Sequence, residues 1–439
     1  MSGLALGLTV FAVMLAFMAI RIPIAFSMFL AGVVGYLGSA GLPALGSLLN
    51  TEILARFTTY DLTVIPLFIL MGNLATSGGI SKALFKCAAA AMGGFRGGLA
   101  MASVIASAAF GSICGSSVAT AATITKVALP ELMRHGYSGR LATGVLASGG
   151  TLGILIPPSV PLVIYAILAE QNIAKLFAAA MIPGLIAVVG YLCAIAIYVR
   201  LFPGHAPTKV DQAEKLTRRD LLAVAPIAAV FGTVFGGIYA GFFTPTEGAA
   251  VGAMAMLVAA ALKRELSWTG LMEAFTSTAQ TSGMIFMIFL GADVMNSAIA
   301  LTQLPTQLVD WVNSMHFSPM AVVVGILLIY VVLGAVMDEL SMLLLTIPVF
   351  FPLVMSMDFG MPQESVAIWF GILVLMTVGF GLLAPPVGLN VYVVNAMASR
   401  VPITESYRGV MPFLISDSIR TVFLVLFPPI TLWFVQFVG

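Results

Sequence analysis

The sequence predicts an all-α polytopic membrane protein built from two inverted repeats, each with a re-entrant helical hairpin and a broken helix. Three observations predict this fold. Of the 439 residues, 60% are hydrophobic and only 8% are charged, whereas roughly a quarter of an ordinary soluble domain is charged. Apolar segments of membrane-spanning length follow one another along the chain. Glycine- and proline-rich interruptions occur at corresponding places in its two halves.

Charged and polar residues between the apolar segments separate the predicted elements. A membrane crossing needs about 20 apolar residues. The segments that satisfy this as simple spans are 4–20, 24–40, 60–78, 174–200, 221–240, 247–262, 276–297 and 417–437. The segments 97–133 and 318–356 are too long for one crossing and are interrupted at their middles, so each predicts a re-entrant hairpin. The segments 141–170 and 366–399 contain Pro-Pro pairs that predict broken helices.

The distribution of basic residues tests the two hairpins. We place the N-terminus outside and treat both hairpins as re-entrant. Every Lys and Arg except Arg56, Lys175 and Lys126 then falls in a predicted cytoplasmic segment. Arg420 is one of these cytoplasmic residues. This asymmetry is what the positive-inside rule expects. Replacing either hairpin by a single crossing inverts the loops that follow and removes the asymmetry.

Internal repetition supports the same organisation. The run Ile-Pro-Pro-Ser-Val at 156–160 is echoed by Ala-Pro-Pro-Val-Gly at 384–388, and the two hairpin centres are separated by nearly the same distance along the chain. The halves are therefore 1–200 and 220–439, joined by a polar cytoplasmic linker at 201–219. Because the first hairpin opens to the cytoplasm and the second to the outside, the repeats are expected to be inverted.

Composition and motifs exclude several classes of function. The net charge of +1 offers no basic field for nucleic acid. The three cysteines are widely spaced, the three histidines fall in predicted loops, and there is no G-x-x-x-x-G-K-[ST] loop, so we expect no metal cluster, no ATP and no organic cofactor. Neither H-E-x-x-H nor G-x-S-x-G occurs, which argues against a membrane enzyme.

Inverted repeats with broken helices are typical of secondary transporters, whose sites lie near the bilayer midplane. Unwound backbone inside a membrane leaves polar groups that protein, water or an ion must satisfy. Carbonyls at helix C-termini suit a cation, and helix N-termini suit a carboxylate. Asp338 and Glu339, at the second hairpin turn, could bind a cation or accept a proton. Two plainer alternatives stay open: the Gly and Ser residues only pack helices, and the acidic pair lies in exterior solvent.

Four runs of residues resemble the large membrane subunit, DctM type, of TRAP transporters. They are Gly-Ser-Ile-Cys-Gly-Ser-Ser-Val-Ala-Thr (111–120), Ile-Pro-Pro-Ser-Val-Pro (156–161), Met-Asp-Glu-Leu-Ser-Met-Leu-Leu-Leu-Thr-Ile-Pro-Val-Phe-Phe-Pro (337–352) and Ala-Pro-Pro-Val-Gly-Leu-Asn-Val-Tyr (384–392). The resemblance implies a sodium-coupled, elevator-type importer of an organic anion, such as a carboxylate, dicarboxylate or sugar acid, with a scaffold and a transport domain. It also implies a four-helix DctQ-type partner, a periplasmic DctP-type binding protein, and a bacterial inner-membrane location with a periplasmic N-terminus.

The family places sodium between each hairpin tip and the opposing broken helix, and its G-x-x-x-P arrangement corresponds to Gly153–Pro157 and Gly381–Pro385. The resulting sodium ligands in the first repeat are Ser112, Gly115, Ser116, Gly153, Ile156 and Pro157. Those in the second repeat are Gly334, Asp338, Thr377, Gly381 and Ala384. The expected substrate contacts are Ser117, Thr120, Pro158, Ser159, Pro386 and Asn390. The alternative within transport is a stand-alone dicarboxylate transporter, coupled to Na⁺ or H⁺, that needs no binding protein.

Overall fold

The computed structural model describes residues 3–207, 218–263 and 266–438, and these residues form helices without any strand. The helices of the first half are α1 (Gly3–Ala19), α2 (Ile24–Phe57), α3 (Val64–Ser77), α4 (Ile80–Met92), α5 (Gly98–Cys114), α6 (Ser117–Arg134), α7 (Gly139–Leu155), α8 (Val160–Leu168) and α9 (Ile173–Leu201). Those of the second half are α10 (Arg218–Tyr239), α11 (Pro245–Leu262), α12 (Trp268–Leu301), α13 (Leu304–Ser314), α14 (Pro319–Gly334), α15 (Glu339–Met355), α16 (Gln363–Gly381), α17 (Leu389–Met397), α18 (Ile403–Leu426) and α19 (Pro428–Leu432).

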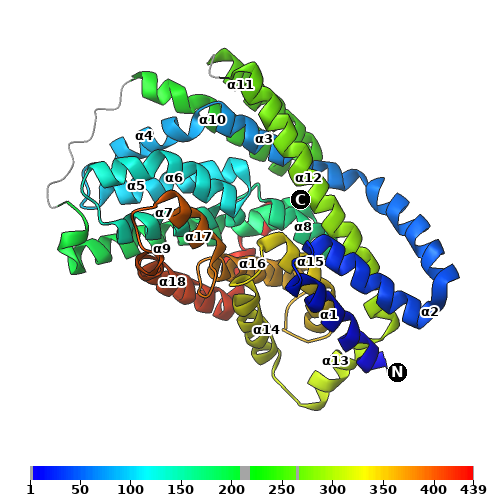
Figure 1. Ribbon diagram of the computed structural model, residues 1–439. Coiled ribbons are helices and arrows are strands. Elements are labelled where there is room, and N and C mark those ends of the chain that lie inside the picture. The colour runs from blue at the N-terminus through cyan, green and yellow to red at the C-terminus, as the bar shows by residue number, and fades with distance from the viewer. Residues whose placement is uncertain (1–2, 208–217, 264–265, 439) are drawn as a thin grey trace.

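The predicted hairpins and broken helices are confirmed as pairs of helices separated by short breaks. Helices α5 and α6 form the first hairpin, and α14 and α15 form the second. Helices α7 and α8 form the first broken helix, and α16 and α17 the second. The same order of elements thus recurs in the two halves (Figure 1). The division at the 201–219 linker stays a prediction, because its residues 208–217 lie outside the described part of the chain.

The first arms of the two broken helices, α7 and α16, lie at the centre of the molecule. Residues 141–155 of α7 and 366–379 of α16 are all buried, and the two helices contact each other. Among the described residues, seven helices are long and apolar enough to cross a membrane, or eight if the bent pair α7–α8 counts as one span. The shorter apolar helices include the hairpin helices α5, α14 and α15, and also α1 and α10, which the sequence predicted as simple spans.

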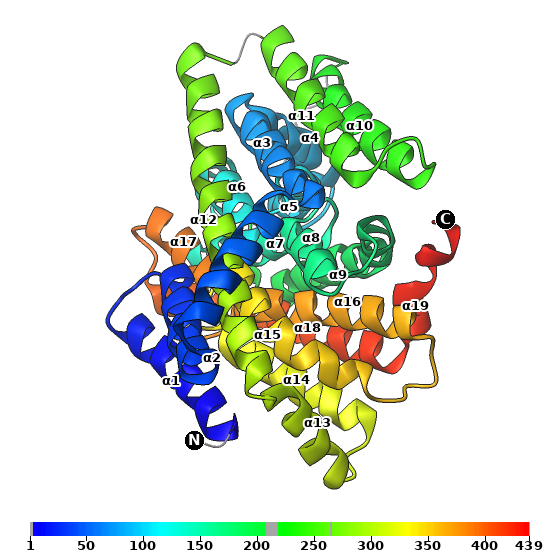
Figure 2. The ribbon, with the colours of Figure 1, turned by 90° about the vertical axis from the view of Figure 1, so that its right-hand side faces the viewer.

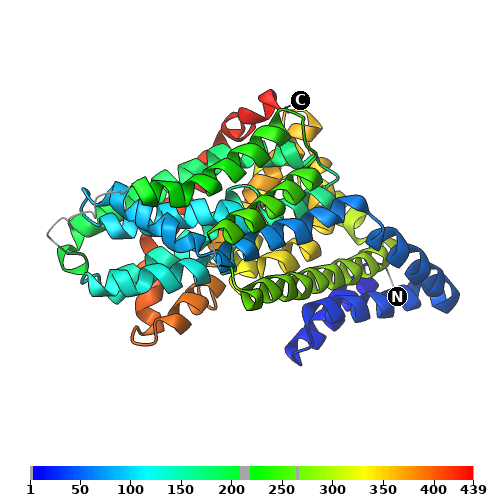
Figure 3. The same cartoon turned by 90° about the horizontal axis from the view of Figure 1, so that it is seen from above.

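Helices α2 and α12 form a long outer pair (Figures 1 and 2). Glycines bring their backbones together, since a Cβ on Gly32 would lie 2.5 Å from the Met295 backbone nitrogen and one on Gly291 would lie 2.4 Å from the Ala25 carbonyl oxygen. Helix α2 departs from helical geometry at Gly41, with a φ of +79°, directly after the predicted end of the 24–40 span. Helix α1 lies beside this pair (Figure 3).

The last predicted span, 417–437, is wrong. The structure has a helix over Ile403–Leu426 instead, followed by the short α19. The helix ends at Leu426 because Phe427 precedes Pro428, and proline disfavours helical backbone in the residue before it. The polar residues near 417 therefore lie inside α18 and do not mark its beginning.

Candidate functional site

The first candidate site lies where the turn of the α5–α6 hairpin meets the break between α7 and α8. Gly115 ends α5 with a φ of +65°, which L side chains rarely adopt, and Ser116 continues in extended backbone before α6 begins. The Gly115 carbonyl accepts a 3.1 Å hydrogen bond from the Val160 backbone N–H at the start of α8. The turn is therefore attached to the far side of the break.

The break itself spans residues 156–159, and the helices on either side differ in direction by 41°. Ile156 is extended, and Pro157 and Pro158, joined by a cis peptide bond, have no N–H to continue the helix. The buried Ser159 hydroxyl donates to the Ile154 carbonyl at 2.7 Å and accepts from the Leu162 N–H at 3.4 Å. This expected substrate contact therefore serves as the N-cap of α8.

Glycines let the hairpin and the broken helix touch. A Cβ on Gly111 would lie 2.6 Å from the Gly153 Cα. A Cβ on Gly153 would lie 2.6 Å from the Thr120 Oγ1 and 2.8 Å from the Ser116 carbonyl oxygen. The structure thus brings Gly153, Ser116 and Thr120 together. Ser112 is engaged within α5, where its hydroxyl donates to the Ala109 carbonyl at 2.9 Å.

The second hairpin and the second broken helix meet in the same way. A Cβ on Gly381 would lie 2.6 Å from the Gly334 Cα. The Ala335 carbonyl accepts a 3.2 Å hydrogen bond from the Val387 N–H across the break, much as Gly115 accepts from Val160 in the first half. The Ala384 N–H bonds to the Gly381 carbonyl at 3.0 Å, which keeps this end of the break in a tight turn.

Asp338 begins the second arm of this hairpin. Its Oδ1 accepts hydrogen bonds from the Leu340 N–H at 3.1 Å and the Ser341 N–H at 3.0 Å, as expected of an N-cap carboxylate. Asp338 is half-buried and Glu339 is buried, which argues against placing the pair in open solvent. Thr377 is engaged within α16, where its hydroxyl donates to the Leu373 carbonyl at 2.8 Å.

The short helix α17 connects the second half to the first hairpin. Asn390 is fully buried, and its Nδ2 donates to the Ser117 Oγ at 2.6 Å and to the Ala147 carbonyl at 3.2 Å. Helix α17 packs against α6, and α8 packs against α15, so each half inserts a short helix beside the hairpin of the other. Pro386, by contrast, is exposed, and its carbonyl accepts from the Tyr407 hydroxyl at 2.9 Å.

Glu339 links the two hairpin turns, a contact that the sequence did not reveal. Its side chain is 6% exposed and interacts with the Ser116 side chain and the Ser117 backbone N–H. The Glu339 Oε2, the Thr120 Oγ1 and the Asn390 Oδ1 are all buried without a hydrogen-bond partner in the described part of the chain. Oxygen atoms of these kinds are the ligands that hard cations prefer. These three oxygen atoms near the start of α6 are therefore available as ligands for a cation.

The sequence also did not reveal a buried charge network that links α18, α9 and α7. The Arg420 Nη2 lies 2.9 Å from the Asp417 Oδ1, and the two side chains are 4% and 1% exposed. The Tyr191 hydroxyl donates to the Asp417 Oδ2 at 2.8 Å and lies 3.0 Å from the Thr151 Oγ1, two residues before Gly153. Arg420 therefore lies buried inside α18 and not at the polar start of a span, where the sequence analysis counted it. The opposite charges at i and i+3 were the signal for a pair within one helix.

Known proteins match this chain over most of its length. Residues 11–430 match the family model described as "Tripartite ATP-independent periplasmic transporter, DctM component". The chain is 31% identical over 386 residues to the C4-dicarboxylate TRAP transporter large permease protein DctM of Pseudomonas aeruginosa, with 87% of each chain covered. It is 29% identical to the sialic acid TRAP transporter large permease protein SiaM of Vibrio cholerae, again with 87% of each covered.

Among solved structures, the crystal structure of the YdaH transporter from Alcanivorax borkumensis matches with a TM-score of 0.62 over 89% of each chain, at 14% identity. That likeness concerns the fold alone. The family match covers the hairpins, both broken helices and all the residues of the two candidate sites. The chain therefore belongs to the DctM family, the large permease component of tripartite ATP-independent periplasmic transporters.

Proposed function

We propose that this permease imports an organic carboxylate across the bacterial cytoplasmic membrane and that sodium drives the import. The observation that carries the proposal is the contact between a hairpin turn and a helix break, present once in each half. Inside a bilayer such breaks leave peptide groups that need ligands. The named substrates of the two relatives, C4-dicarboxylate and sialic acid, are both carboxylates, which supports this substrate class.

Two sodium sites follow from this proposal. The first uses oxygens of the Gly115–Ser116 turn and of the break after Gly153, with Ser112, Ile156 and Pro157 at its edge. The second uses the turn between Gly334 and Asp338 and the break between Gly381 and Ala384, beside Thr377. The residues of both sites are suited to sodium because backbone carbonyls, hydroxyls and one carboxylate are suitable ligands for a hard monovalent cation.

The substrate carboxylate would bind near the start of α6, where helix N-termini attract negative charge. Ser117, Thr120 and Asn390 contribute polar atoms there. The Ser117 and Thr120 hydroxyls can donate to a carboxylate, whereas the unpartnered Asn390 Oδ1 only accepts and suits a cation. Glu339 lies against the same turn. A cation next to Glu339 would offset its charge when an anion enters, so sodium and substrate would favour each other's binding.

The transport cycle follows the tripartite arrangement of the family. A DctP-type periplasmic protein delivers the substrate, and a DctQ-type membrane subunit completes the permease. The hairpins and broken helices move together as a transport domain against a scaffold of the remaining spans, with the N-terminus on the periplasmic side. The DctM match favours this arrangement over a transporter that works without a binding protein.

Uptake into proteoliposomes tests the proposal. The chain is reconstituted with its DctQ-type subunit and its DctP-type binding protein, and uptake of radiolabelled succinate and sialic acid is measured under an inward sodium gradient. We expect uptake that requires both the gradient and the binding protein. Equal uptake under a potassium gradient would reject sodium coupling, and uptake without the binding protein would support a stand-alone transporter.

Sodium is also expected to stabilise the folded protein directly. At a hundredfold excess over Kd, a ligand bound only by the folded state stabilises it by about 2.7 kcal/mol. Thermal unfolding in sodium and in potassium at equal ionic strength measures this difference. We expect Ser116→Ala and Asp338→Asn each to reduce it. Asn is as good an N-cap as Asp, so Asp338→Asn removes the charge while keeping the hydrogen bonds to Leu340 and Ser341.

Asp358→Asn is the matched control for Asp338→Asn. Asp358 is exposed, and its Oδ1 accepts from the Gly360 N–H at 2.8 Å, a local turn of the same kind but away from the proposed sites. It should leave the sodium response unchanged. An undiminished response in both Ser116→Ala and Asp338→Asn would contradict the assignment of sodium to the hairpin turns.

A further inference from the structure

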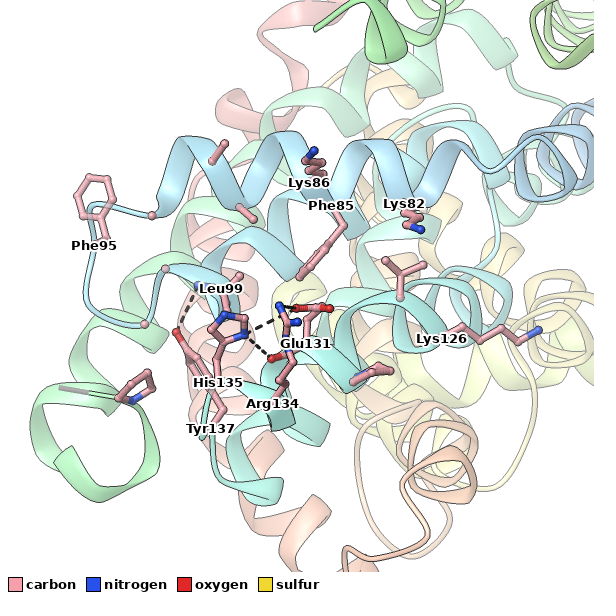
Figure 4. A pocket seen from close by; sticks show the side chains of 18 residues that line it. Lys82, Phe85, Lys86, Phe95, Leu99, Lys126, Glu131, Arg134, His135 and Tyr137 are labelled. Carbon is pink, nitrogen blue, oxygen red and sulfur yellow. Dashed lines mark hydrogen bonds and ion pairs between the residues drawn. The ribbon is translucent and has the colours of Figure 1, made fainter. Parts of the chain in front are cut away.

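The buried charge network that links α18, α9 and α7 takes no part in the transport sites proposed above. It consists of Arg420 and Asp417 of α18, Tyr191 of α9 and Thr151 of α7, and all four side chains are buried. A cavity of about 600 Å³ at the base of the first hairpin is lined by other residues (Figure 4). The network is therefore separate from that cavity as well, and its last member, Thr151, leads to the first helix break.

The direction of the hydrogen bonds in this network follows from the chemistry of its groups. An ionised carboxylate only accepts, so the Tyr191 hydroxyl donates its single proton to the Asp417 Oδ2, 2.8 Å away. The Tyr191 oxygen then accepts from the Thr151 hydroxyl, which lies 3.0 Å away. Thr151 shares its proton between Tyr191 and the Ser148 carbonyl at 2.8 Å. The charge of Asp417 thus determines the orientation of the Thr151 hydroxyl.

Thr151 lies where the first arms of the two broken helices approach each other. It precedes Gly153 by two residues, and the glycine that faces it, Gly379 of α16, precedes Gly381 by two residues. A Cβ on Gly379 would lie 3.5 Å from the Thr151 Cβ and 4.0 Å from its Cγ2. The Thr151 side chain therefore faces α9 with its hydroxyl and α16 with its apolar atoms.

The hydrogen bond to Tyr191 selects one rotamer of Thr151. Threonine in a helix divides between two χ1 rotamers. Rotation about χ1 would move the hydroxyl away from Tyr191 and the methyl group to a new position against α16. The network holds the rotamer in which the hydroxyl meets Tyr191. It therefore fixes the packing of α7 against α16, next to the two breaks that carry the proposed sodium sites.

We propose that Tyr191 and Asp417 are positioning residues for sodium binding. They hold Thr151, and through it the spacing of the two broken helices, without touching the ion. Ligands bind a cation tightly only when packing holds them at the right separation, so a looser contact between α7 and α16 lowers the affinity for sodium. This inference rests on the proposed sodium coupling. A network that served stability alone would leave sodium affinity unchanged.

Tyr191→Phe tests the proposal, because it removes one hydroxyl and keeps the ring. The melting temperature of the full-length chain in detergent is titrated with sodium, while potassium keeps the ionic strength constant. We expect the half-saturating sodium concentration to rise about three- to tenfold, the change that corresponds to the net loss of one hydrogen bond. Thr151→Val should raise it similarly. The double variant should be no weaker than the weaker single variant, because both substitutions remove the same contact.

Tyr198→Phe is the matched control. Tyr198 lies seven residues further along α9 and is also buried, and its hydroxyl lies 2.7 Å from the His205 Nδ1. The His205 carbonyl accepts from the Ser138 N–H at the start of α7, so this contact is at the end of α7 opposite the break. Tyr198→Phe should lower the melting temperature without sodium and leave the half-saturating sodium concentration unchanged.

A paired replacement separates positioning from stability. Asp417→Leu combined with Arg420→Met removes both buried charges together, and it should bind sodium as weakly as Tyr191→Phe although both charges are gone. If the parent chain shows no sodium-specific stabilisation, the proposed function fails and this inference fails with it. If the parent responds, and Tyr191→Phe and the paired replacement both saturate at the parent concentration, only the positioning role is overturned.

Discussion

Replacing Asp417 by alanine is expected to destabilise the folded protein by about 3–5 kcal/mol, because it leaves a buried guanidinium without its counter-charge. Arg420 is 4% exposed, and the Asp417 Oδ1 lies 2.9 Å from its Nη2. The Arg420 Nε and Nη1 already have no hydrogen-bond partner among the described residues. Among the described residues, Asp417 is the acidic group that pairs with Arg420, so its removal leaves the buried charge without that partner.

Unfolding in detergent, followed by tryptophan fluorescence or thermal melting, measures this effect. Glu364→Ala is the control. The Lys175 Nζ lies 2.6 Å from the Glu364 Oε1, but this ion pair is partly exposed. Such pairs contribute about 1 kcal/mol or less to stability. Asp417→Leu combined with Arg420→Met should recover most of the loss, because apolar pairs of similar volume often replace buried ion pairs without cost. An Asp417→Ala variant as stable as Glu364→Ala would contradict the buried pair.

Replacing Gly381 by alanine is expected to abolish transport and to destabilise the protein by roughly 1–3 kcal/mol through overpacking. The added Cβ would lie 2.6 Å from the Gly334 Cα and 2.7 Å from its carbonyl carbon, and these backbone atoms cannot move aside as a flexible side chain could. The hairpin would have to separate from the broken helix. In the proposed mechanism, that separation removes the second sodium site.

Gly325→Ala is the matched control, because Gly325 lies in the same hairpin, within α14, and a Cβ added there would meet no neighbouring atom within 4 Å. Alanine in an open helical position should stabilise the protein by about 0.5–1 kcal/mol and leave uptake intact. Proteoliposome uptake and thermal melting of both variants are compared at equal reconstituted protein. Normal uptake by Gly381→Ala would show that the close contact is dispensable.

Local sequence signals predicted the breaks in this fold accurately. The turn of the first hairpin, expected within 111–117, occurs at Gly115 and Ser116, and both Pro-Pro pairs lie in helix breaks. Glycine and proline act on their own backbone and that of the adjacent turn, so their effect does not depend on distant parts of the chain. The error at 417–437 had a local cause too, because a pair of opposite charges inside a helix resembled the polar end of one.

The sequence by itself determined the membrane class, the paired hairpins and broken helices, and the residues at their turns. Only the tertiary structure decided which polar atoms meet: Asn390 with Ser117, Glu339 with the first hairpin turn, and Tyr191 with Asp417. Hydropathy and backbone breaks are properties of short stretches of chain. A contact between residues hundreds of positions apart depends on how the helices pack, and no local pattern encodes that packing.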